Sequence, residues 1–363
     1  IFGGEFPGEM IIPRLYSAHV LLIPAILIGL FTAHIGLVFV QKHTQFPGPG
    51  RTNENVVGFP LMPVYTAKAG GFFFMVFGVL AVISALVTIN PIWAYGPYDP
   101  SPVTAGSQPD WYMGFADGAL RLLPGFLEFE LFGFTWSMNV FLGAVALIPL
   151  MYTAAGVYPW IEAWVTGDKR EHHLLDRPRN APTRTAIGMA AFAFYVVLMF
   201  AAGNDIMAIR LQLSINDVTI LFRMLVFVVP VIVFWVTRRI CWSLQRHDRE
   251  KVLHGRETGT IIRTAEGKFF ERHEDIDAFE RWPLVAFESP APLALTDGAD
   301  ANGVSAKDAK KERRRVAWSN FYFKTRVEPV TPTELAAAHH HGEHEAISGG
   351  SAPAAIKHDK HPH

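Results

Sequence analysis

The chain has 363 residues, of which 50% are hydrophobic and 18% charged, and its formal net charge is -1. This composition excludes a disordered chain and is typical of a membrane protein, and the near-neutral charge gives no reason to expect a nucleic-acid partner. The sequence contains one cysteine, Cys241, which excludes an internal disulfide and a cysteine-ligated cluster. We expect Cys241 to be a small apolar filler in a helix.

Five apolar runs are long enough to cross a bilayer. They extend over residues 13–40, 69–89, 134–157, 185–202 and 218–240. Pro24, Pro149 and Pro230 lie inside three of these runs, and prolines are tolerated in lipid when neighbouring helices satisfy the carbonyl groups that they leave free. We therefore predict an all-α polytopic membrane bundle of five transmembrane helices over residues 1–242. A largely irregular, partly disordered cytoplasmic tail is expected over residues 243–363.

The distribution of charge in the loops predicts the orientation of this bundle. Basic residues gather after the first, third and fifth runs: Lys42, Arg51 and Lys68; Lys169, Arg170, Arg177, Arg179 and Arg184; and Arg238, Arg239, Arg246, Arg249 and Lys251. The two intervening loops hold most of the acids: Asp99, Asp110, Asp117, Glu128, Glu130 and Asp205. The positive-inside rule then places the N-terminus outside and the C-terminal tail in the cytoplasm.

Two histidines, His19 and His34, lie 15 residues apart in the first apolar run. On an α-helix, this separation is a rise of about 22 Å and about 60° beyond four full turns, so both rings lie on broadly the same side. Gly29 and Gly36 keep that side thin, which lets a flat macrocycle approach the backbone. Either histidine can be a hydrogen-bonded core residue, but an ionisable pair inside a span indicates a functional site, and imidazole is a usual ligand of haem iron. No covalent haem-attachment motif occurs, so any haem is held non-covalently.

The second informative motif, Pro109-Asp110-Trp111-Tyr112, lies in the long outer loop over residues 90–133. Trp111 and Tyr112 can be ordinary interfacial anchors, and Asp110 can be only a helix N-cap. An acid beside two amphipathic aromatic side chains, on the same membrane side as His19, is also a place where a quinol ring can be held and can lose a proton. We expect a short amphipathic helix in this loop.

The tail and the last two spans give weaker signals. Residues 260–272 alternate around Glu266-Gly267, which predicts a short β-hairpin, and the composition of 290–312 indicates a linker. An aromatic cluster is expected to dock on another element: Trp318, Phe321, Tyr322 and Phe323. Asp205 and Arg223 are expected to form a structural ion pair. The histidine-rich end over residues 339–363 is expected to be a disordered tail.

Taken together, these motifs resemble the cytochrome b subunits of quinol–cytochrome c oxidoreductases over residues 1–245. Arg14 to His19, followed by Pro24 and His34, resembles that family's fourth transmembrane helix. Residues 109–112 stand where the family carries a Pro-Glu-Trp-Tyr quinol motif, and the order of the five spans resembles helices four to eight. The segment Phe46-Pro47-Gly48-Pro49-Gly50, the Asp variant of the motif and the long tail are most similar to the actinobacterial branch. Because the sequence starts at Ile1, without a signal-peptide pattern, we expect the C-terminal part of such a subunit.

The resemblance implies two b haems. His19 would ligate the iron of the low-potential haem near the outer face, and His34 that of the high-potential haem near the cytoplasmic face. Arg14 would pair with a haem propionate or brace its helix. The second axial ligands would come from N-terminal helices of the same cytochrome b, which we expect to be absent from this sequence.

The resemblance also implies bifurcated oxidation of a quinol, most similar to menaquinol chemistry, near residues 109–112. One electron would pass to a Rieske iron–sulfur subunit, and the second through the His19 haem to the His34 haem. Asp110 would accept a quinol proton, because burial raises the pKa of a carboxyl group towards the working range, and Tyr112 would position or relay. Asp110 replaces the family's Glu and reaches one methylene less far.

The implied partners are the Rieske subunit, a c-type cytochrome subunit and membrane lipid, with a terminal-oxidase supercomplex as a further implication of the actinobacterial resemblance. The chain would be active only within that complex, in the bacterial plasma membrane. Two alternatives remain open. One is the membrane cytochrome b of a dehydrogenase, which has no use for residues 109–112. The other is a transporter or structural subunit without haem, which predicts ionisable residues at the membrane midplane that the second to fourth runs almost lack.

Overall fold

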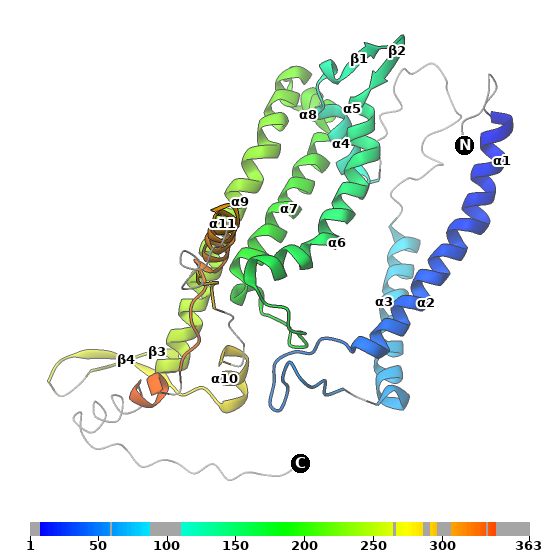
Figure 1. Ribbon diagram of the computed structural model, residues 1–363. Coiled ribbons are helices and arrows are strands. Elements are labelled where there is room, and N and C mark those ends of the chain that lie inside the picture. The colour runs from blue at the N-terminus through cyan, green and yellow to red at the C-terminus, as the bar shows by residue number, and fades with distance from the viewer. Residues whose placement is uncertain are drawn as a thin grey trace. The chain divides into compact units, whose positions relative to one another are not determined.

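The computed structural model describes residues 8–58, 60–87, 110–263, 266–285, 291–295, 306–331 and 333–338, and most of these are helical (Figure 1). Among the described residues, five helical stretches are long and apolar enough to cross a membrane. They are Glu9–Gln41, Leu61–Leu86, Met138–Thr166, Pro182–Ala201 and Ile215–His254. The predicted all-α polytopic membrane architecture is therefore confirmed.

The elements follow one another along the chain with short connections. The helical elements before the fourth span are α1 (Gly8–Ser17), η1 (Ala18–Leu22), α2 (Ile23–Gln41), η2 (Leu61–Tyr65), α3 (Thr66–Leu86), α4 (Gly114–Leu122), η4 (Gly125–Leu127), α5 (Met138–Val140), η5 (Phe141–Ala146) and α6 (Leu147–Thr166). Those that follow are η6 (Pro178–Asn180), α7 (Pro182–Ala201), α8 (Asn204–Leu211), α9 (Ile215–His254), α10 (Ala278–Val285) and α11 (Ala306–Phe323). Two antiparallel hairpins pair β1 (Glu128–Leu131) with β2 (Phe134–Ser137) and β3 (Arg256–Arg263) with β4 (Phe269–Glu274).

Two span boundaries differ from the sequence prediction. The third span begins at Met138, because residues 134–137 form β2, which pairs with β1 across a two-residue turn. Both turn residues, Phe132 and Gly133, have positive φ angles of 58° and 74°, the backbone geometry that joins the strands of a tight hairpin. The fifth helix, α9, continues to His254, so the boundary that we expected after residue 242 falls inside a helix.

Prolines in the membrane helices are accompanied by widened, π-helical turns. Pro24 has no N–H group to donate, and in a regular α-helix its ring would clash with the carbonyl of Val20. The π turn η1 stands just before it, where the N–H of Ile23 donates to the carbonyl of Ala18. The π turn η5 lies in the same way shortly before Pro149. Each widened turn relieves the proline clash without ending the helix.

The described chain divides into two compact units. The first comprises residues 1–73 and 170–175, and the second residues 74–169 and 176–363. In the first unit, the loop after α2 is organised around the buried side chain of Gln45. Its amide nitrogen donates to the carbonyls of Thr52 and Asn55, at 3.1 and 2.6 Å, and its backbone N–H donates to the carbonyl of His173 at 2.7 Å. The basic loop is therefore ordered by polar backbone contacts.

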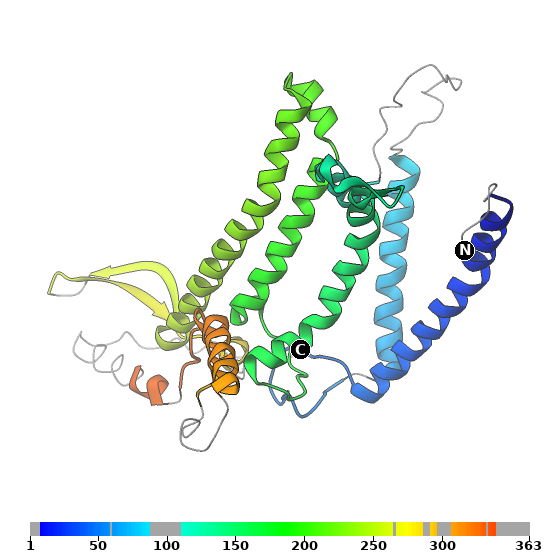
Figure 2. The ribbon, with the colours of Figure 1, turned by 45° about the horizontal axis from the view of Figure 1, so that its top comes forward.

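In the second unit, α7 and α9 lie side by side (Figures 1 and 2), with α4 packed across one end of them. Their contact is an apolar cluster: Ala119, Leu122, Val197, Leu198, Ala201, Ala208, Val218, Phe222 and Val226. This cluster is the main buried core among the described residues, and it fixes the outer-loop helix α4 on the ends of the membrane helices. The amphipathic helix that the sequence predicted in this loop is confirmed.

The tail contains more structure than the sequence indicated. The predicted hairpin is confirmed as β3–β4, whereas the linker expected to extend to residue 312 is wrong from Ala306 onward, where α11 begins. The predicted docking of the aromatic cluster is confirmed, because the ring of Phe321 stacks on that of Phe234 and Tyr322 hydrogen-bonds the Glu162 carboxylate. Burial first, and then that bond, raise the pKa of Tyr322. The histidine-rich end over residues 339–363 lies outside the described residues.

Candidate functional site

The two candidate haem ligands lie on the first membrane helix, in the first unit. His19 lies in the π turn η1 and His34 in the middle of α2, and both side chains are exposed. Because η1 widens the helix at His19, the angle between the two rings differs from that of a regular α-helix, on which the sequence prediction depended. Arg14, in the α-helical turn before η1, is also exposed.

The surroundings of these histidines fit the axial ligation of haem. Within the described part of the chain, neither imidazole forms a hydrogen bond or an ion pair, although the helix that carries them is apolar. The one other polar side chain between them, Thr32, donates to the carbonyl of Ile28 at 2.8 Å and so satisfies itself within the helix. A Cβ atom added at Gly29 or at Gly36 would meet nothing within 4 Å. Two free imidazoles beside open helix surface are a donor set suited to haem iron.

The outer-loop motif forms a compact turn at the start of α4, in the second unit. The hydroxyl of Tyr112 donates a hydrogen bond to Oδ2 of Asp110 at 2.6 Å. The backbone carbonyl of Asp110 accepts the N–H groups of Met113 and Gly114, at 2.8 and 3.1 Å. Asp110 is thus not the side-chain cap of the helix, because its side chain bonds Tyr112 instead. Pro109, the first residue of the motif, lies outside the described residues.

All three described side chains of the motif are exposed. The indole of Trp111 is 77% exposed, and its ring meets that of Tyr112 edge-on with centroids 5.9 Å apart. The hydrogen bond to Asp110, and then the charge of that carboxylate, raise the pKa of Tyr112, so the phenol stays protonated and remains a donor near neutral pH. The burial that we expected for Asp110 is not provided by the described residues, since the carboxylate is exposed.

Helix α4 holds this turn against α7 through residues without bulk. A Cβ atom added at Gly118 would lie 1.8 Å from the backbone oxygen of Leu198, so only glycine permits this approach. Gly114, at the start of the helix, lies against Met199. Glycines four residues apart share one helix face, so the spacing of Gly114 and Gly118 is a sequence signal for this close contact that hydropathy and charge do not carry.

A polar network fixes the other end of α4 and corrects one prediction. Arg121 forms ion pairs with Asp117 and Asp205, at 2.9 and 3.0 Å, and its guanidinium also donates to Oδ1 of the buried Asn204 at 2.8 Å. Arg223 donates to the backbone carbonyl of Leu122 at 2.7 Å, where a cation is favourable at a helix C-terminus. The predicted ion pair between Asp205 and Arg223 is therefore wrong, because each of these residues contacts α4 instead.

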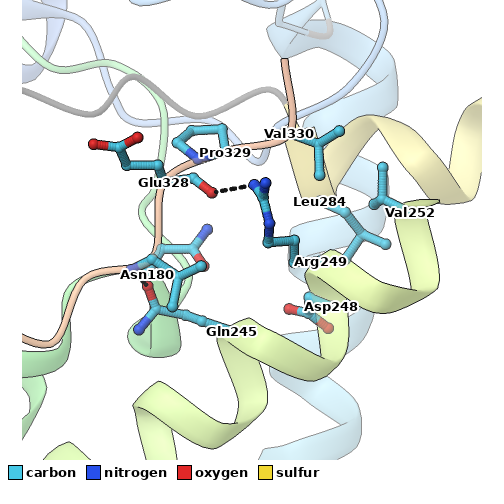
Figure 3. Close-up of a pocket in the computed structure, with 10 residues that line it drawn as sticks. Asn180, Gln245, Asp248, Arg249, Val252, Leu284, Glu328, Pro329 and Val330 are labelled. Atoms are coloured by element: carbon cyan, nitrogen blue, oxygen red, sulfur yellow. Dashed lines mark hydrogen bonds between the residues drawn. The ribbon is translucent and has the colours of Figure 1, made fainter. Parts of the chain in front are cut away.

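A small cavity of about 310 Å³ lies elsewhere in the second unit, where the tail crosses the end of α9 (Figure 3). Its lining joins residues of α9, η6, α10 and the tail segment: Asn180, Gln245, Asp248, Arg249, Val252, Leu284, Val327, Glu328, Pro329 and Val330. Arg249 spans it to donate to the backbone carbonyl of Glu328 at 3.0 Å. None of the site residues predicted from the sequence lines this cavity.

Comparison with known proteins relates these two sites to one family. A family model described as "Cytochrome b(N-terminal)/b6/petB" matches residues 1–97, which contain both histidines. A cytochrome b subunit of the cytochrome bc1 complex from Streptomyces coelicolor is 51% identical over 346 residues, 94% of this chain and 63% of that protein. Its counterpart from Mycobacterium tuberculosis is 46% identical over 293 residues, 81% of this chain and 52% of that protein. The protein of the same name from Corynebacterium diphtheriae is 42% identical over 301 residues, 82% and 55% of the two chains.

The chain is thus similar to actinobacterial cytochrome b subunits over most of its own length, and it spans 52–63% of the length of these relatives. The matching family model is the one for the N-terminal part of cytochrome b. The comparisons therefore do not support the expectation that the chain corresponds only to helices four to eight and the tail. They likewise do not support the expectation that the second axial ligands lie in absent helices.

Proposed function

We propose that this chain is the cytochrome b subunit of a respiratory cytochrome bc1-type complex and that it takes part in quinol oxidation. The observation that carries this proposal is the pair of exposed imidazoles, His19 and His34, which have no protein partner in the described part of an apolar membrane helix. Similarity to actinobacterial cytochrome b subunits over 94% of the chain supports it independently.

Each histidine would provide one axial ligand to a non-covalently bound haem b, and Arg14 would lie beside the His19 site to pair with a propionate. When bound, the two haems supply one-electron carriers, so that this subunit takes one electron of the quinol while an iron–sulfur partner takes the other. The protein contributes the spacing of its two ligands and the open surface at Gly29 and Gly36.

The turn formed by Asp110, Trp111 and Tyr112 would bind the quinol, together with Pro109. Tyr112 donates its proton to Oδ2 of Asp110, which leaves the other carboxylate oxygen able to accept a hydrogen bond from a quinol hydroxyl. Asp110 would then take that proton as a general base and release it outside. The exposed face of Trp111 offers an apolar surface against which a quinone ring can lie, and closure over this turn would supply the desolvation that the described residues lack. Menaquinol is the proposed substrate.

The proposed partners are a Rieske iron–sulfur subunit and a c-type cytochrome subunit, in keeping with the complex that the relatives' names specify. The proposed location is the bacterial plasma membrane, with the tail in the cytoplasm, because the loops with most basic residues lie on the tail side. The outer-loop turn at Asp110 then faces the other side, where proton release is required.

The test is a reduced-minus-oxidised absorption spectrum of membranes that carry the whole complex, with the wild type beside His19→Ala and His34→Ala. We expect each substitution to remove or shift the α band of one b haem. His43→Ala is the matched control, because His43 follows the same helix, is exposed and contacts the carbonyl of its neighbour Thr44. This variant should keep both bands. If all four spectra coincide, the histidines are structural and the proposal fails.

A further inference from the structure

Helix α11 has one face packed on the second unit and one face exposed. Its inward residues recur at helical spacing and are buried or half-buried: Ala309, Glu312, Val316, Ser319 and Phe323. Ser319 is fully buried, and its hydroxyl accepts the N–H of Leu293 at 3.0 Å. The exposed face carries four basic side chains followed by one large aromatic: Lys310, Lys311, Arg313, Arg314 and Trp318. The helix as a whole has six basic and two acidic residues, a net charge of +4 from six minus two.

Three hydrogen bonds place α11 at one end of the membrane helices. The Nε of Arg315 donates to the carbonyl of Trp164 in the last turns of α6, at 2.7 Å. The carbonyl of Tyr322 accepts the hydroxyl of Thr183 in the first turn of α7, at 2.6 Å. The carbonyl of Phe321 accepts an N–H of Arg238 in α9, at 3.0 Å. The helix therefore lies where two spans end and where α9 acquires its first charges after the apolar stretch.

The aromatic end of α11 reaches the apolar part of α9. The Phe321 ring stacks on that of Phe234, with centroids 6.3 Å apart and an interplanar angle of 8°, and it meets Trp235 edge-on at 6.2 Å. Trp318 meets Phe321 edge-on and is 54% exposed, as is Trp235. Exposed tryptophans beside a row of basic side chains are the arrangement found where a protein surface passes from lipid to water.

We propose that the exposed face of α11, defined by Lys310, Lys311, Arg314 and Trp318, binds the headgroups of anionic phospholipids. The basic side chains would contact the lipid phosphates, and Trp318 would lie among the headgroups one to two turns further along the helix. The charge of the face selects an anionic lipid, and its position at the ends of α6 and α7 selects a lipid surface over a soluble anion. This proposal does not depend on the proposed redox function, and it gives the tail a role in fastening the bundle to the membrane surface.

The test uses the full chain in nanodiscs, with a bimane label at Ala317→Cys in a Cys241→Ser background. Ala317 is exposed next to Trp318, and Cys241, the sole cysteine of the sequence, is buried. Quenching is compared between spin-labelled phosphatidylglycerol and spin-labelled phosphatidylcholine that carry the same label on the same acyl chain. At low ionic strength we expect phosphatidylglycerol to quench several-fold more strongly, and we expect salt to remove the difference.

Two triple variants separate recognition by α11 from a general charge effect. Lys310→Gln, Lys311→Gln and Arg314→Gln together should abolish the preference for phosphatidylglycerol. The matched control removes three exposed basic residues from the hairpin instead: Arg263→Gln, Lys268→Gln and Arg272→Gln. This control should keep the preference. Equal quenching by both lipids in the wild type, quenching by neither lipid, or a preference that survives the α11 variant would each overturn the proposal, and the second result would indicate a protein partner on this face.

Discussion

Replacing Gly118 by alanine tests how closely α4 must approach α7. The added Cβ would lie 1.8 Å from the carbonyl oxygen of Leu198 and 2.7 Å from its carbonyl carbon. Both atoms belong to the backbone of α7, so no side-chain rotation can relieve the contact. Moving the Cβ from 1.8 Å to 3.0 Å from that oxygen, the lower limit of real contacts, requires α4 to shift by about 1.2 Å.

The magnitude follows from this shift. Overpacking of this kind costs about 1–3 kcal/mol of unfolding free energy, because neighbouring groups must move together. Helix α4 begins directly after Tyr112, so the shift is transmitted to the Asp110–Tyr112 turn. A misplacement of about 1 Å at a reacting group lowers a rate by roughly 100-fold. We therefore expect Gly118→Ala to lower quinol oxidation far more than it lowers haem content.

The assay is quinol oxidation by the purified complex, normalised to b-haem absorbance, together with the apparent Tm. Gly125→Ala is the matched control, because a Cβ at Gly125 meets nothing within 4 Å and Gly125 does not have a positive φ. This variant should behave as the wild type. Equal activity and equal Tm in Gly118→Ala and Gly125→Ala would refute the idea that close packing of α4 positions the turn.

Three further predictions concern single side chains. Asp110→Asn should leave both b-haem spectra unchanged and slow quinol oxidation by about 100-fold or more in turnover assays, because an amide cannot accept the proton. Arg121→Gln should lower the apparent Tm and cost roughly 1–2 kcal/mol, since it removes two ion pairs and a hydrogen bond that are only partly screened by solvent. Hydrogen bonds from Lys251 and Arg256 lower the pKa of Glu280, so this contact stabilises the fold above the ordinary glutamate pKa of about 4.3 and is lost as pH falls through the lowered value. Amide hydrogen exchange in α10 should accelerate over that acidic range.

Each of these predictions has a control within the chain. Glu128→Gln, on the exposed strand β1, should leave turnover unchanged, and unaltered turnover in Asp110→Asn would exclude its role as proton acceptor. Arg210→Gln should leave the Tm unchanged, and an equal Tm for Arg121→Gln would show that the network is not stabilising. Glu280→Gln should remove the acid dependence of exchange in α10, and persistence of that dependence would assign it to another group.

The sequence by itself determined the features that depend on local composition. The five membrane helices follow from apolar length, because a bilayer requires about twenty consecutive apolar residues whatever the neighbouring helices do. The hairpin β3–β4 follows from alternation around the turn at Gly267, which has a φ of 86°. The candidate site residues His19, His34 and Asp110 were selected because ionisable groups in or beside an apolar segment are costly unless they have a use.

The tertiary structure decided which groups meet, since hydropathy reports how apolar a segment is and carries no information about its partners. It pairs Asp205 with Arg121 and directs Arg223 to the end of α4, although sequence distance favoured pairing the two with each other. It inserts a π turn at His19, because the clash of Pro24 is resolved through backbone geometry and does not appear in composition. It also folds α11 out of a segment with a linker's composition, because Ser319 and Phe321 find partners that are distant in sequence.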